Sequence, residues 1–497
     1  MIINSICPCK EDILNTETEK KLNGILKETF RIKEFRSSQK KIISTVLSGS
    51  NALVLMPTGM GKSLCYQLPA LMLPGLTIVI SPLIALMKDQ CDSLLRLEID
   101  AGYINSSLSK SEREKRYRYI SEGRYKIIFV SPERFRKKRF LEAVSKREIS
   151  LLAVDEAHCA SQWGNDFRPD YARISEFRKF LKNPVTIALT ATATPDVQKD
   201  IIEILGMKEN EISVYNEGIE RLNINLAVHE VLDRNEKFKI IKDEILNKGQ
   251  RNTIIYFNLI KDLEDFSKIF QENRIRHLAY HGKLSADRRR EIHMKFLEYD
   301  RVIILATNAF GMGIDRPDID LIIHADMPSS LEFYYQEIGR AGRDGRKCNA
   351  VLLYCQDDLA VQMDFIRWKN PDDSFIKKCY FHLKNLGDKI NAYSYEDIQE
   401  QLVFKNRNDH RLSTVLNLFD RYHVTNGSLD TFNLLFTNEL PDLLTDRSFI
   451  HKKLDLDNRR LYNMLQYAKT GKCRRDAINE YFGADKTQCG NCDNCIE

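Results

Sequence analysis

Short apolar runs alternate with longer amphipathic stretches from about residue 40 to residue 355. The first five runs each end in small, polar or charged residues: NALVLM, LTIVISP, YKIIFVSP, LLAVDEAH and TIALTATAT. Runs of this length that are apolar on both faces are typical of buried parallel strands, and the stretches between them are typical of covering helices. The pattern predicts a parallel sheet with helices on both of its faces.

A second series with the same pattern follows: NTIIYFN, HLAYHG, VIILATN, LIIHADMP and NAVLLYC. The segment SVYNEGIERLNIN, residues 213 to 225, separates the two series. The sequence therefore predicts an α/β fold with two parallel-sheet domains in tandem. In such sheets ligands bind beyond the carboxyl ends of the strands. The residues that could bind ligands or take part in a reaction lie at those ends here.

The strand pattern stops near residue 361, and the remaining chain is charged and mostly helical. YSYEDIQEQL and DHRLSTVLNLFDRYHV have helical patterns, and Asn426-Gly427 in the following HVTNGSLDTFNLLF indicates a tight hairpin. Helices followed by a hairpin suit a winged-helix-like module. A purely helical structural insertion is the alternative.

Length and composition describe a globular protein with more than one core. The chain has 497 residues, of which 43% are hydrophobic and 29% are charged, so about two to four domains are expected. Because no apolar run is long enough to span a membrane and MIINSICPCKEDIL lacks a signal-peptide core, we expect an intracellular protein without membrane association. A net charge of +5 is compatible with a polyanionic partner but does not specify one.

A near match to a phosphate-binding loop follows the first apolar run. The pattern G-x-x-x-x-G-K-[ST] is met at Gly61, Lys62 and Ser63, whereas Met56 stands where the pattern has its first glycine. Backbone N–H groups of such a turn attract phosphate, the lysine reaches the β- and γ-phosphates, and the serine hydroxyl can ligate Mg²⁺. The predicted ATP-binding loop consists of Met56, Pro57, Thr58, Gly59, Met60, Gly61, Lys62 and Ser63. A plain strand-to-helix turn is the alternative.

An acidic pair follows the fourth apolar run, in VDEAH. At a strand end, Asp155 can hold Mg²⁺ through water, and Glu156 can orient or deprotonate the attacking water. A lone Asp-Glu pair is more often a solvated surface feature, but a phosphate loop on the same predicted sheet favours catalysis. His158 is assigned either to interdomain signalling or to a satisfied, half-buried position.

Two arginines of the second domain lie in QEIGRAGRDG. Arg340 and Arg343 are three residues apart and fall on one helical face, with glycines on either side. An arginine finger stabilises the charge of a transferring phosphoryl group and is worth roughly 10³ to 10⁵ in rate. A basic helix start that binds backbone phosphate is the alternative. If these arginines reach a nucleotide in the first half, the site lies between the domains.

Four of the twelve cysteines crowd the last 25 residues as C-x15-C-x2-C-x2-C. They are Cys473, Cys489, Cys492 and Cys495. Four thiolates at such spacing suit a closed, tetrahedral Zn²⁺ site with a structural role. An iron–sulfur cluster and free thiols are the alternatives. Arg474 and Arg475, beside the cluster, are expected to face DNA or solvent.

The motifs together resemble those of superfamily 2 helicases, and more specifically the RecQ family of DNA helicases. The phosphate loop, VDEAH, TATATP, FGMGIDRPD and QEIGRAGRDG occur in this order. FRSSQ, SQWGNDFRPDY and the terminal cysteine cluster carry the more specific likeness. The resemblance implies two RecA-like parallel-sheet domains, followed by a mostly helical zinc-binding C-terminal region. It also accounts for Met56, because this superfamily often lacks the first glycine of the loop.

The resemblance implies further residue roles. Arg36 and Gln39 match the motif that reads adenine, beside Ile32 where the family often has an aromatic residue. Trp163, Phe167 and Arg168 match the aromatic-rich loop that senses single-stranded DNA, with the core-packing role as the alternative for the two aromatics. Asn165 stands where the family commonly has histidine, which puts the strength of coupling in question. ISPLIALMKDQ, INSSLS, VSPERF and ATNAFGMGID resemble motifs that contact the strand or couple the domains.

The implied organisation is a tail over residues 1–21, an ATP-binding domain over 22–217, a second helicase domain over 218–360 and a zinc-binding region over 361–497. About a hundred residues separate Trp368 from Cys473, far more than the family's usual connection, so the inserted module is placed near 373–450. We expect an ATP- and Mg²⁺-dependent DNA helicase with a structural Zn²⁺, which acts on single-stranded, duplex or branched DNA; the resemblance implies 3′-to-5′ polarity. An RNA helicase and a non-hydrolysing, nucleotide-gated DNA clamp are the alternatives. The expected compartment is the nucleus of a eukaryote or the cytoplasm of a bacterium.

Overall fold

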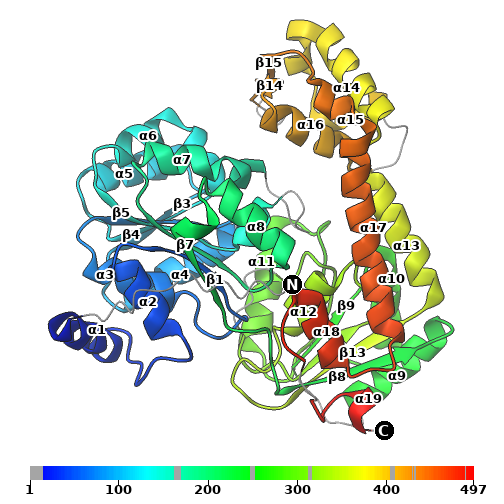
Figure 1. Cartoon of the computed structure of the whole chain (residues 1–497). Coiled ribbons are helices and arrows are strands. Elements are labelled where there is room, and N and C mark those ends of the chain that lie inside the picture. Colours follow the sequence, from blue (N-terminus) through cyan, green and yellow to red (C-terminus); the bar gives the residue numbers. More distant parts are fainter. Residues whose placement is uncertain are drawn as a thin grey trace.

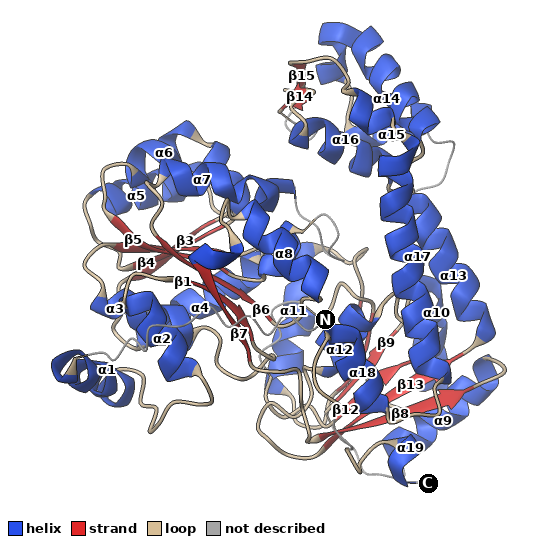
Figure 2. Cartoon of the chain, viewed as in Figure 1, coloured by secondary structure: helices blue, strands red, loops and turns tan. Residues whose placement is uncertain are grey.

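The computed structural model describes residues 15–161, 169–246, 252–311, 316–402, 409–427, 429, 433–486 and 489–496. Two sheet domains lie next to each other, and a long helical stalk rises from the second of them to a separate small module (Figure 1). The view coloured by secondary structure shows helices on both faces of each sheet (Figure 2).

The first domain contains a seven-stranded sheet in the order β3-β4-β2-β5-β6-β1-β7, in which all neighbours are parallel. Its strands are β1 (Asn51–Leu55), β2 (Leu76–Ile80), β3 (Ala101–Ile104), β4 (Ile127–Val130), β5 (Ile149–Val154), β6 (Val185–Thr190) and β7 (Ile212–Asn216). Its helices are α1 (Thr16–Glu28), α2 (Gln39–Leu47), α3 (Leu64–Met72), α4 (Ile84–Arg96), α5 (Lys110–Ser121), α6 (Lys138–Val144), α7 (Ile174–Phe180) and α8 (Pro195–Ile204). The first helix begins six residues before the boundary predicted at residue 22.

The central strands of this sheet are mostly apolar because they are buried on two sides. In β1, Leu53 and Leu55 belong to one hydrophobic core, whereas Ala52 and Val54 belong to the core on the opposite face. Successive side chains of a strand point to opposite faces, so a strand between two helical layers needs apolar residues at every position. Loop chemistry fixes the helix ends, as where Ser109 and Glu112 form a capping box at the start of α5.

The second domain contains a six-stranded parallel sheet in the order β10-β11-β9-β12-β13-β8. Its strands are β8 (Ile224–Glu230), β9 (Thr253–Tyr256), β10 (Leu278–Tyr280), β11 (Ile303–Ala306), β12 (Leu321–His324) and β13 (Cys348–Tyr354). Its helices are α9 (Arg234–Leu246), α10 (Ile260–Glu272), α11 (Ala286–Glu298) and α12 (Leu331–Ile338). Two parallel-sheet domains in tandem confirm the predicted fold class. Strands β3, β7 and β8 were not among the predicted runs.

The C-terminal region is helical and is divided between the second domain and a separate module. Its helices are α13 (Gln356–Lys369), α14 (Asp373–Leu386), α15 (Tyr395–Leu402), α16 (Arg411–Arg421), α17 (Arg447–Lys469), α18 (Arg474–Phe482) and α19 (Asp493–Ile496). The C-terminal part of α17 contributes Met464 and Tyr467 to the core of the second domain, and α18 contributes Ile478 and Phe482. The zinc-binding region is therefore built onto that domain rather than folded separately.

The inserted module has a hydrophobic core of its own, whose buried members run from Phe375 to Leu444. It holds α14, α15 and α16, followed by two antiparallel strands, β14 (Thr425–Asn426) and β15 (Leu435–Phe436). The predicted tight turn is wrong, because Asn426 pairs with Leu435 and eight residues therefore join the strands. Three helices and a strand pair occur in the order expected for a winged-helix-like module, and that interpretation stays a prediction.

The module also contacts the first domain. Arg136, in the 3₁₀ helix η1 (Pro132–Arg136), donates two hydrogen bonds to the Asp420 carboxylate of α16, at 2.6 and 2.5 Å. The same guanidinium is 2.5 Å from Asp170 in the 3₁₀ helix η3 (Pro169–Arg173). This partly buried guanidinium, which contacts one carboxylate from each part, links the insert to the first domain, although the stalk that carries the insert rises from the second (Figure 1).

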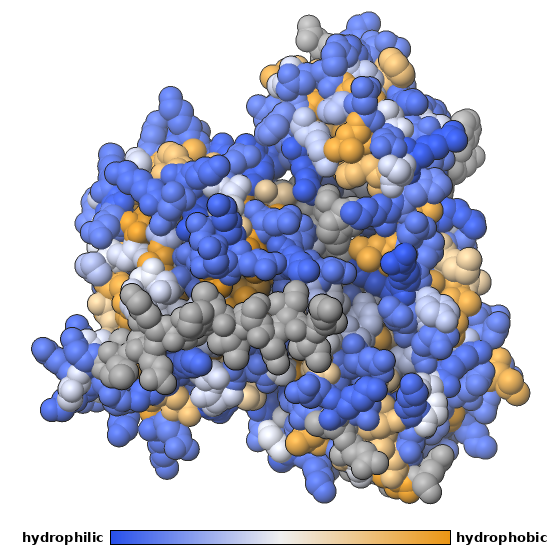
Figure 3. All heavy atoms as spheres, viewed as in Figure 1, coloured by the Kyte–Doolittle hydropathy of each residue, from blue (hydrophilic) through white to orange (hydrophobic). Residues whose placement is uncertain are grey.

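The visible face of the molecule is mostly hydrophilic, and its apolar residues form small, separate patches (Figure 3). Among the described residues, no helix has the length and apolar character that a membrane span requires.

Candidate functional site

The predicted phosphate loop, residues 56–63, connects the carboxyl end of β1 to the start of α3. Gly59 and Gly61 have φ angles of +83° and +82°, a backbone conformation that side chains with a Cβ rarely adopt. Ser63 is the residue immediately before α3, so the loop ends at a helix N-terminus. A turn of this kind presents backbone N–H groups and the positive end of the helix dipole to an anion.

Arg36 and Gln39, predicted to read adenine, lie against this loop. The Gln39 amide donates to the carbonyls of Met60 and Gly61 at 3.0 and 3.1 Å and accepts from the Arg36 N–H at 2.8 Å. The Arg36 guanidinium donates to the Gly59 carbonyl at 3.1 Å. Both side chains therefore support the loop in this conformation, and their contact with a base stays a prediction. Ile32 packs partly buried among α1, α2 and α3.

Asp155 and Glu156 follow β5 directly, and Glu156 adopts a left-handed backbone with φ +48°. Burial and the neighbouring Glu156 charge raise the pKa of Asp155 to about 7, although Lys62 opposes this rise. Burial also acts against the charge of Glu156, but Lys62, His158 and the two arginines outweigh it, so the Glu156 pKa is lowered. One carboxyl group of the pair is thus protonated more readily than the other, which remains anionic.

His158 lies in the interior of the first domain with 9% of its surface exposed. Its Nδ1 is 2.9 Å from the Thr190 hydroxyl and 3.4 Å from a Glu156 carboxylate oxygen. Thr190 in turn donates to the Thr192 carbonyl at 3.0 Å, within the TATATP segment. These contacts favour the satisfied, half-buried position over interdomain signalling, and they join the acidic pair to the end of β6.

Arg340 and Arg343 reach this site from the second domain. The Thr58 hydroxyl donates to the Gly339 carbonyl at 2.8 Å, which brings the arginine-bearing loop onto the phosphate loop. A Cβ added at Gly59 would lie 3.3 Å from Cγ of Arg343, so the arginine stem covers that glycine. The charges of both arginines also lower the pKa of Glu156. The candidate nucleotide site is therefore composed of both domains.

The donor set fits a nucleoside triphosphate. Lys62 Nζ and Arg340 Nε are buried and have no hydrogen-bond partner among the described residues. A buried N–H donor without an acceptor is costly, and a phosphate group would supply the missing acceptors. Ser63 at the end of the loop and Asp155 at the end of β5 offer the oxygen ligands that Mg²⁺ prefers.

One residue of the site has no motif or spacing in the sequence that points to it. Arg221, between β7 and β8, donates to the Thr58 and Gly339 carbonyls at 3.0 and 3.1 Å and to the Ala341 and Gly342 carbonyls at 2.7 and 2.9 Å. It is 8% exposed. An arginine in a polar interdomain segment has no motif or periodicity that distinguishes it from a solvated one.

The predicted DNA-sensing residues Trp163, Phe167 and Arg168, together with Asn165, lie outside the described residues. The positions on either side of that segment are fixed next to the nucleotide site. Ser161 is buried and its N–H donates to the His158 carbonyl at 3.2 Å. Tyr171 is buried as well, and its hydroxyl donates to the Asp155 carbonyl at 3.0 Å. Both ends of the predicted sensor therefore contact the DEAH turn.

The remaining strand-contacting motifs begin at the carboxyl ends of their strands. Ser81 follows β2, Asn105 follows β3, Ser131 follows β4 and Thr307 follows β11. Because parallel strands end at one edge of their sheet, these polar residues of the first domain share an edge with the phosphate loop. Such an arrangement suits phosphate contacts that position a strand without reading its sequence.

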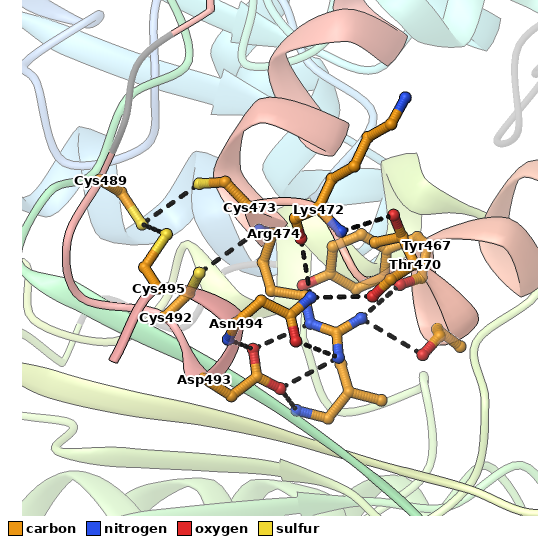
Figure 4. Close-up of polar contacts among 12 residues, drawn as sticks. Tyr467, Thr470, Lys472, Cys473, Arg474, Cys489, Cys492, Asp493, Asn494 and Cys495 are labelled. Carbon is orange, nitrogen blue, oxygen red and sulfur yellow. Dashed lines mark hydrogen bonds and ion pairs between the residues drawn. The ribbon is translucent and has the colours of Figure 1, made fainter. Parts of the chain in front are cut away.

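The four C-terminal cysteines converge, and their sulfur atoms all lie within 4.8 Å of one another. The Cys473 and Cys489 sulfurs are 3.5 Å apart, and those of Cys489 and Cys495 are 4.0 Å apart (Figure 4). Zn–S bonds of about 2.3 Å in a tetrahedron place sulfur atoms roughly 3.8 Å apart. The residues therefore fit a closed Zn²⁺ site. Cys492 also pairs with Leu226 of β8, so the site is attached to the second sheet.

Both expectations for the neighbouring arginines are wrong, because each is 5% exposed and is engaged by the protein. Arg474 donates to the Asp493 carboxylate at 2.9 Å and to the Tyr467 carbonyl at 2.7 Å (Figure 4). Arg475 donates to the carbonyls of Arg221 and Ile224 at 3.0 and 2.8 Å. The first arginine fixes the cysteine-bearing segment, and the second ties it to the segment that carries Arg221.

Three family profiles match the chain. The family described as DEAD/DEAH box helicase matches residues 36–201, the helicase conserved C-terminal domain matches residues 236–345, and the RecQ zinc-binding family matches residues 441–496. The first two profiles cover the two halves of the nucleotide site, and the third covers the cysteine cluster.

Relatives among curated proteins are similar over most of the chain. ATP-dependent DNA helicase RecQ of Bacillus subtilis (strain 168) is 40% identical over 382 residues, which are 76% of this chain and 63% of that protein. The probable ATP-dependent DNA helicase RecS of the same organism is 38% identical over 70% of this chain and 70% of its own length. The chain spans 52–63% of the RecQ relatives from B. subtilis, Pasteurella multocida and Haemophilus influenzae.

Solved structures show the same fold at low sequence identity. Mss116p bound to single-stranded RNA and AMP-PNP has a TM-score of 0.57 at 18% identity, covering 93% of this chain and 95% of that chain. The DUF1998 helicase MrfA bound to DNA and AMPPNP has a TM-score of 0.56 at 18% identity, covering 69% of this chain and 51% of that chain. At these identities the likeness concerns the fold alone.

Proposed function

The chain belongs to the RecQ family of helicases, and we propose that it is an ATP-dependent DNA helicase that moves along single-stranded DNA and unwinds duplex or branched DNA. The observation that carries the proposal is the composite nucleotide site. Arg343 of the second domain covers Gly59 of the phosphate loop, and its charge acts on Glu156 of the first domain. A nucleotide in such a site contacts both domains, so its hydrolysis changes how strongly they are held together.

The proposed division of labour follows from the chemistry of each side chain. Lys62 and the backbone of residues 56–63 bind the phosphates, and Ser63 and Asp155 hold Mg²⁺. Glu156 orients and deprotonates the attacking water, for which its lowered pKa keeps it anionic. Arg340 and Arg343 stabilise the charge that develops on the transferring phosphoryl group.

Coupling to DNA is proposed to run through the segment that contains Trp163, Phe167 and Arg168. Ser161 and Tyr171, on either side of it, contact the backbone of the DEAH turn. A strand that stacks on this segment would thereby act on the residues that hold the water and the metal. The inserted module is proposed to add a winged-helix-like contact, and movement is proposed to be 3′-to-5′, as expected for the family.

The cofactors of this family are ATP with Mg²⁺ and a structural Zn²⁺, and the residues of this chain fit all three. Zn²⁺ holds the four cysteine thiolates together and leaves no open position for catalysis. The proposed domain limits are 22–217, 218–360 and 361–497. The proposed compartment is the one that contains the DNA: the nucleus in a eukaryote and the cytoplasm in a bacterium.

The test is ATP turnover with and without single-stranded DNA, beside the variant Lys62→Ala. We expect strong stimulation by DNA that is lost in the variant, because the ammonium group is the main cation facing the β- and γ-phosphates. A strand-displacement assay on a duplex with a 3′ overhang then tests unwinding, and a 5′ overhang serves as the control for polarity.

Two other results would replace the proposal. DNA binding without stimulated turnover would indicate a nucleotide-gated clamp, and Asn165 would be the first residue to change. Stimulation by single-stranded RNA that equals or exceeds stimulation by DNA of the same length would indicate an RNA helicase.

A further inference from the structure

One buried guanidinium joins the two halves of the nucleotide site. Arg221 donates to Thr58 of the phosphate loop and, on the other side of the domain boundary, to Gly339, Ala341 and Gly342. The last three residues surround Arg340 and lead directly into Arg343. Beside the Thr58 hydroxyl, which also donates to the Gly339 carbonyl, the Arg221 side chain therefore binds the loop of both arginines to the phosphate loop.

The geometry uses a property that only arginine has. A guanidinium is planar, remains charged when buried and presents its N–H donors in a fixed fork. Burial lowers the pKa of Arg221 from its very high ordinary value, and the charge persists because that value lies far above neutrality. A lysine would keep the charge, but its flexible stem carries only three N–H donors, too few for the four carbonyl groups that Arg221 contacts.

A neighbouring side chain supports the same arrangement. The Asn223 amide donates to the carbonyls of Gly342 and Arg346 at 2.8 and 2.9 Å. The backbone that carries Arg221 is held in turn by Arg475, which donates to the Arg221 and Ile224 carbonyls at 3.0 and 2.8 Å. Arg475 lies two residues after Cys473, so this contact extends from the cysteine cluster to the nucleotide site.

We propose that Arg221 is a positioning residue for ATP hydrolysis, which fixes the loop of Arg340 and Arg343 against the phosphate loop, and that Arg475 holds Arg221 in place. The inference rests on the proposed ATPase activity. It concerns the transition state more than ground-state binding, because the phosphate loop and Lys62 bind the nucleotide without Arg221. A misplacement of about 1 Å in a catalytic group can cost roughly 10² in rate.

The test compares Arg221→Lys and Arg221→Gln with the wild type. We expect kcat for DNA-stimulated ATP turnover to fall by about 10- to 100-fold, while KM and the affinity for a fluorescent ADP analogue change by less than about threefold. The matched control is Arg178→Gln. Arg178 is a partly buried arginine of α7 whose Nε donates to the Thr186 hydroxyl at 3.1 Å, and its replacement should leave turnover unchanged.

The possible results separate the two claims. A wild type without ATP turnover would refute the proposed function itself. An active wild type with unchanged kcat in both Arg221 variants would refute only the positioning role, as would a loss of nucleotide affinity equal to the loss of kcat. If the Arg221 variants do not fold, Asn223→Ala removes two of the loop's hydrogen bonds and should lower kcat several-fold without lowering ADP affinity. An unchanged kcat in that variant would also overturn the inference.

Arg475→Gln tests the second half of the proposal. We expect a smaller loss of kcat than in Arg221→Gln, with full zinc content and unchanged ADP affinity, because the cysteine ligands and the phosphate loop are intact. The double variant Arg221→Gln/Arg475→Gln should be no slower than Arg221→Gln alone. Independent, multiplicative losses would show that Arg475 does not act through Arg221.

Discussion

Replacement of Asp155 by asparagine should stabilise the nucleotide-free protein while it abolishes Mg²⁺-dependent turnover. Asp155 is 6% exposed, and burial together with the Glu156 charge raises its pKa from 3.8 to about 7. Above neutral pH the ionised Asp155 carboxylate therefore destabilises the folded protein. Asparagine has nearly the same shape without the charge. Its carbonyl oxygen can still accept the Glu156 N–H that Asp155 accepts at 3.0 Å.

The magnitude follows from the two pKa values. Because the folded-state pKa is the higher one, the protonated carboxyl stabilises the fold fully below pH 3.8, and this stabilisation is lost as the pH rises to about 7. The interval corresponds to roughly 4 kcal/mol at 1.36 kcal/mol per pH unit. At about 2–4 °C per kcal/mol for a domain of this size, Asp155→Asn should raise Tm by on the order of 10 °C at pH 8 and by little near pH 4.5.

The assay is scanning calorimetry of both proteins in EDTA, without nucleotide, between pH 4.5 and 8.5. Glu156→Gln is the control with the opposite sign. The pKa of Glu156 is lowered by surrounding cations, so its carboxylate stabilises the fold above pH 4.5, and the variant should melt lower than the wild type at neutral pH. A difference in Tm between Asp155→Asn and the wild type that does not grow with pH would refute the reasoning.

Three further perturbations test other parts of the molecule. Gly59→Ala should lower kcat at least tenfold, because the new Cβ would lie 3.3 Å from Arg343, whereas Gly49→Ala, with a similar φ of +88° and no atom within 4 Å, should not. Equal effects of the two on turnover would contradict this account. Asp420→Asn should weaken the docking of the inserted module by roughly 1–3 kcal/mol, since it removes the charge that binds Arg136, and should raise amide hydrogen exchange in α16. Unchanged exchange would show that other contacts hold the module. Chelation of zinc should lower the Tm of the second domain, whose core includes the last helices, and re-addition of Zn²⁺ should restore it. A Tm that does not depend on zinc content would separate the cluster from the fold.

The fold class and most strands could be predicted because a strand between two helical layers must be apolar at every position. The three strands that the pattern missed depart from that rule for identifiable reasons. β3 is an edge strand whose sequence, AGYI, includes a glycine and therefore forms no continuous apolar run, and β7 and β8 carry polar or exposed residues such as Asn216, His229 and Glu230. Their place in the sheet is decided by pairing with a neighbouring strand, which the local sequence does not encode.

The candidate site divides in the same way. Lys62 could be selected from the spacing of the phosphate loop, and Asp155 and Glu156 could be selected because they directly follow a predicted strand. The cysteine cluster could be selected because four thiols in the last 25 residues, at this spacing, have few other uses. The expectation that Arg474 and Arg475 face DNA or solvent is wrong. Two adjacent arginines in a polar segment are usually solvated, and only the packing of α18 against β8 shows that both are buried.

By itself the sequence determined the two parallel-sheet domains, the phosphate loop, the acidic pair and the metal-binding cysteines, because hydrophobic period and ligand spacing are local properties of the chain. Tertiary structure alone decided that the arginines of one domain lie on the phosphate loop of the other, and that the inserted module returns to the first domain through Arg136 and Asp420. It also decided the role open to Arg221, whose four acceptors lie 118 to 163 residues away in the chain. Contacts of that separation form only when both domains fold and meet, so no local pattern records them.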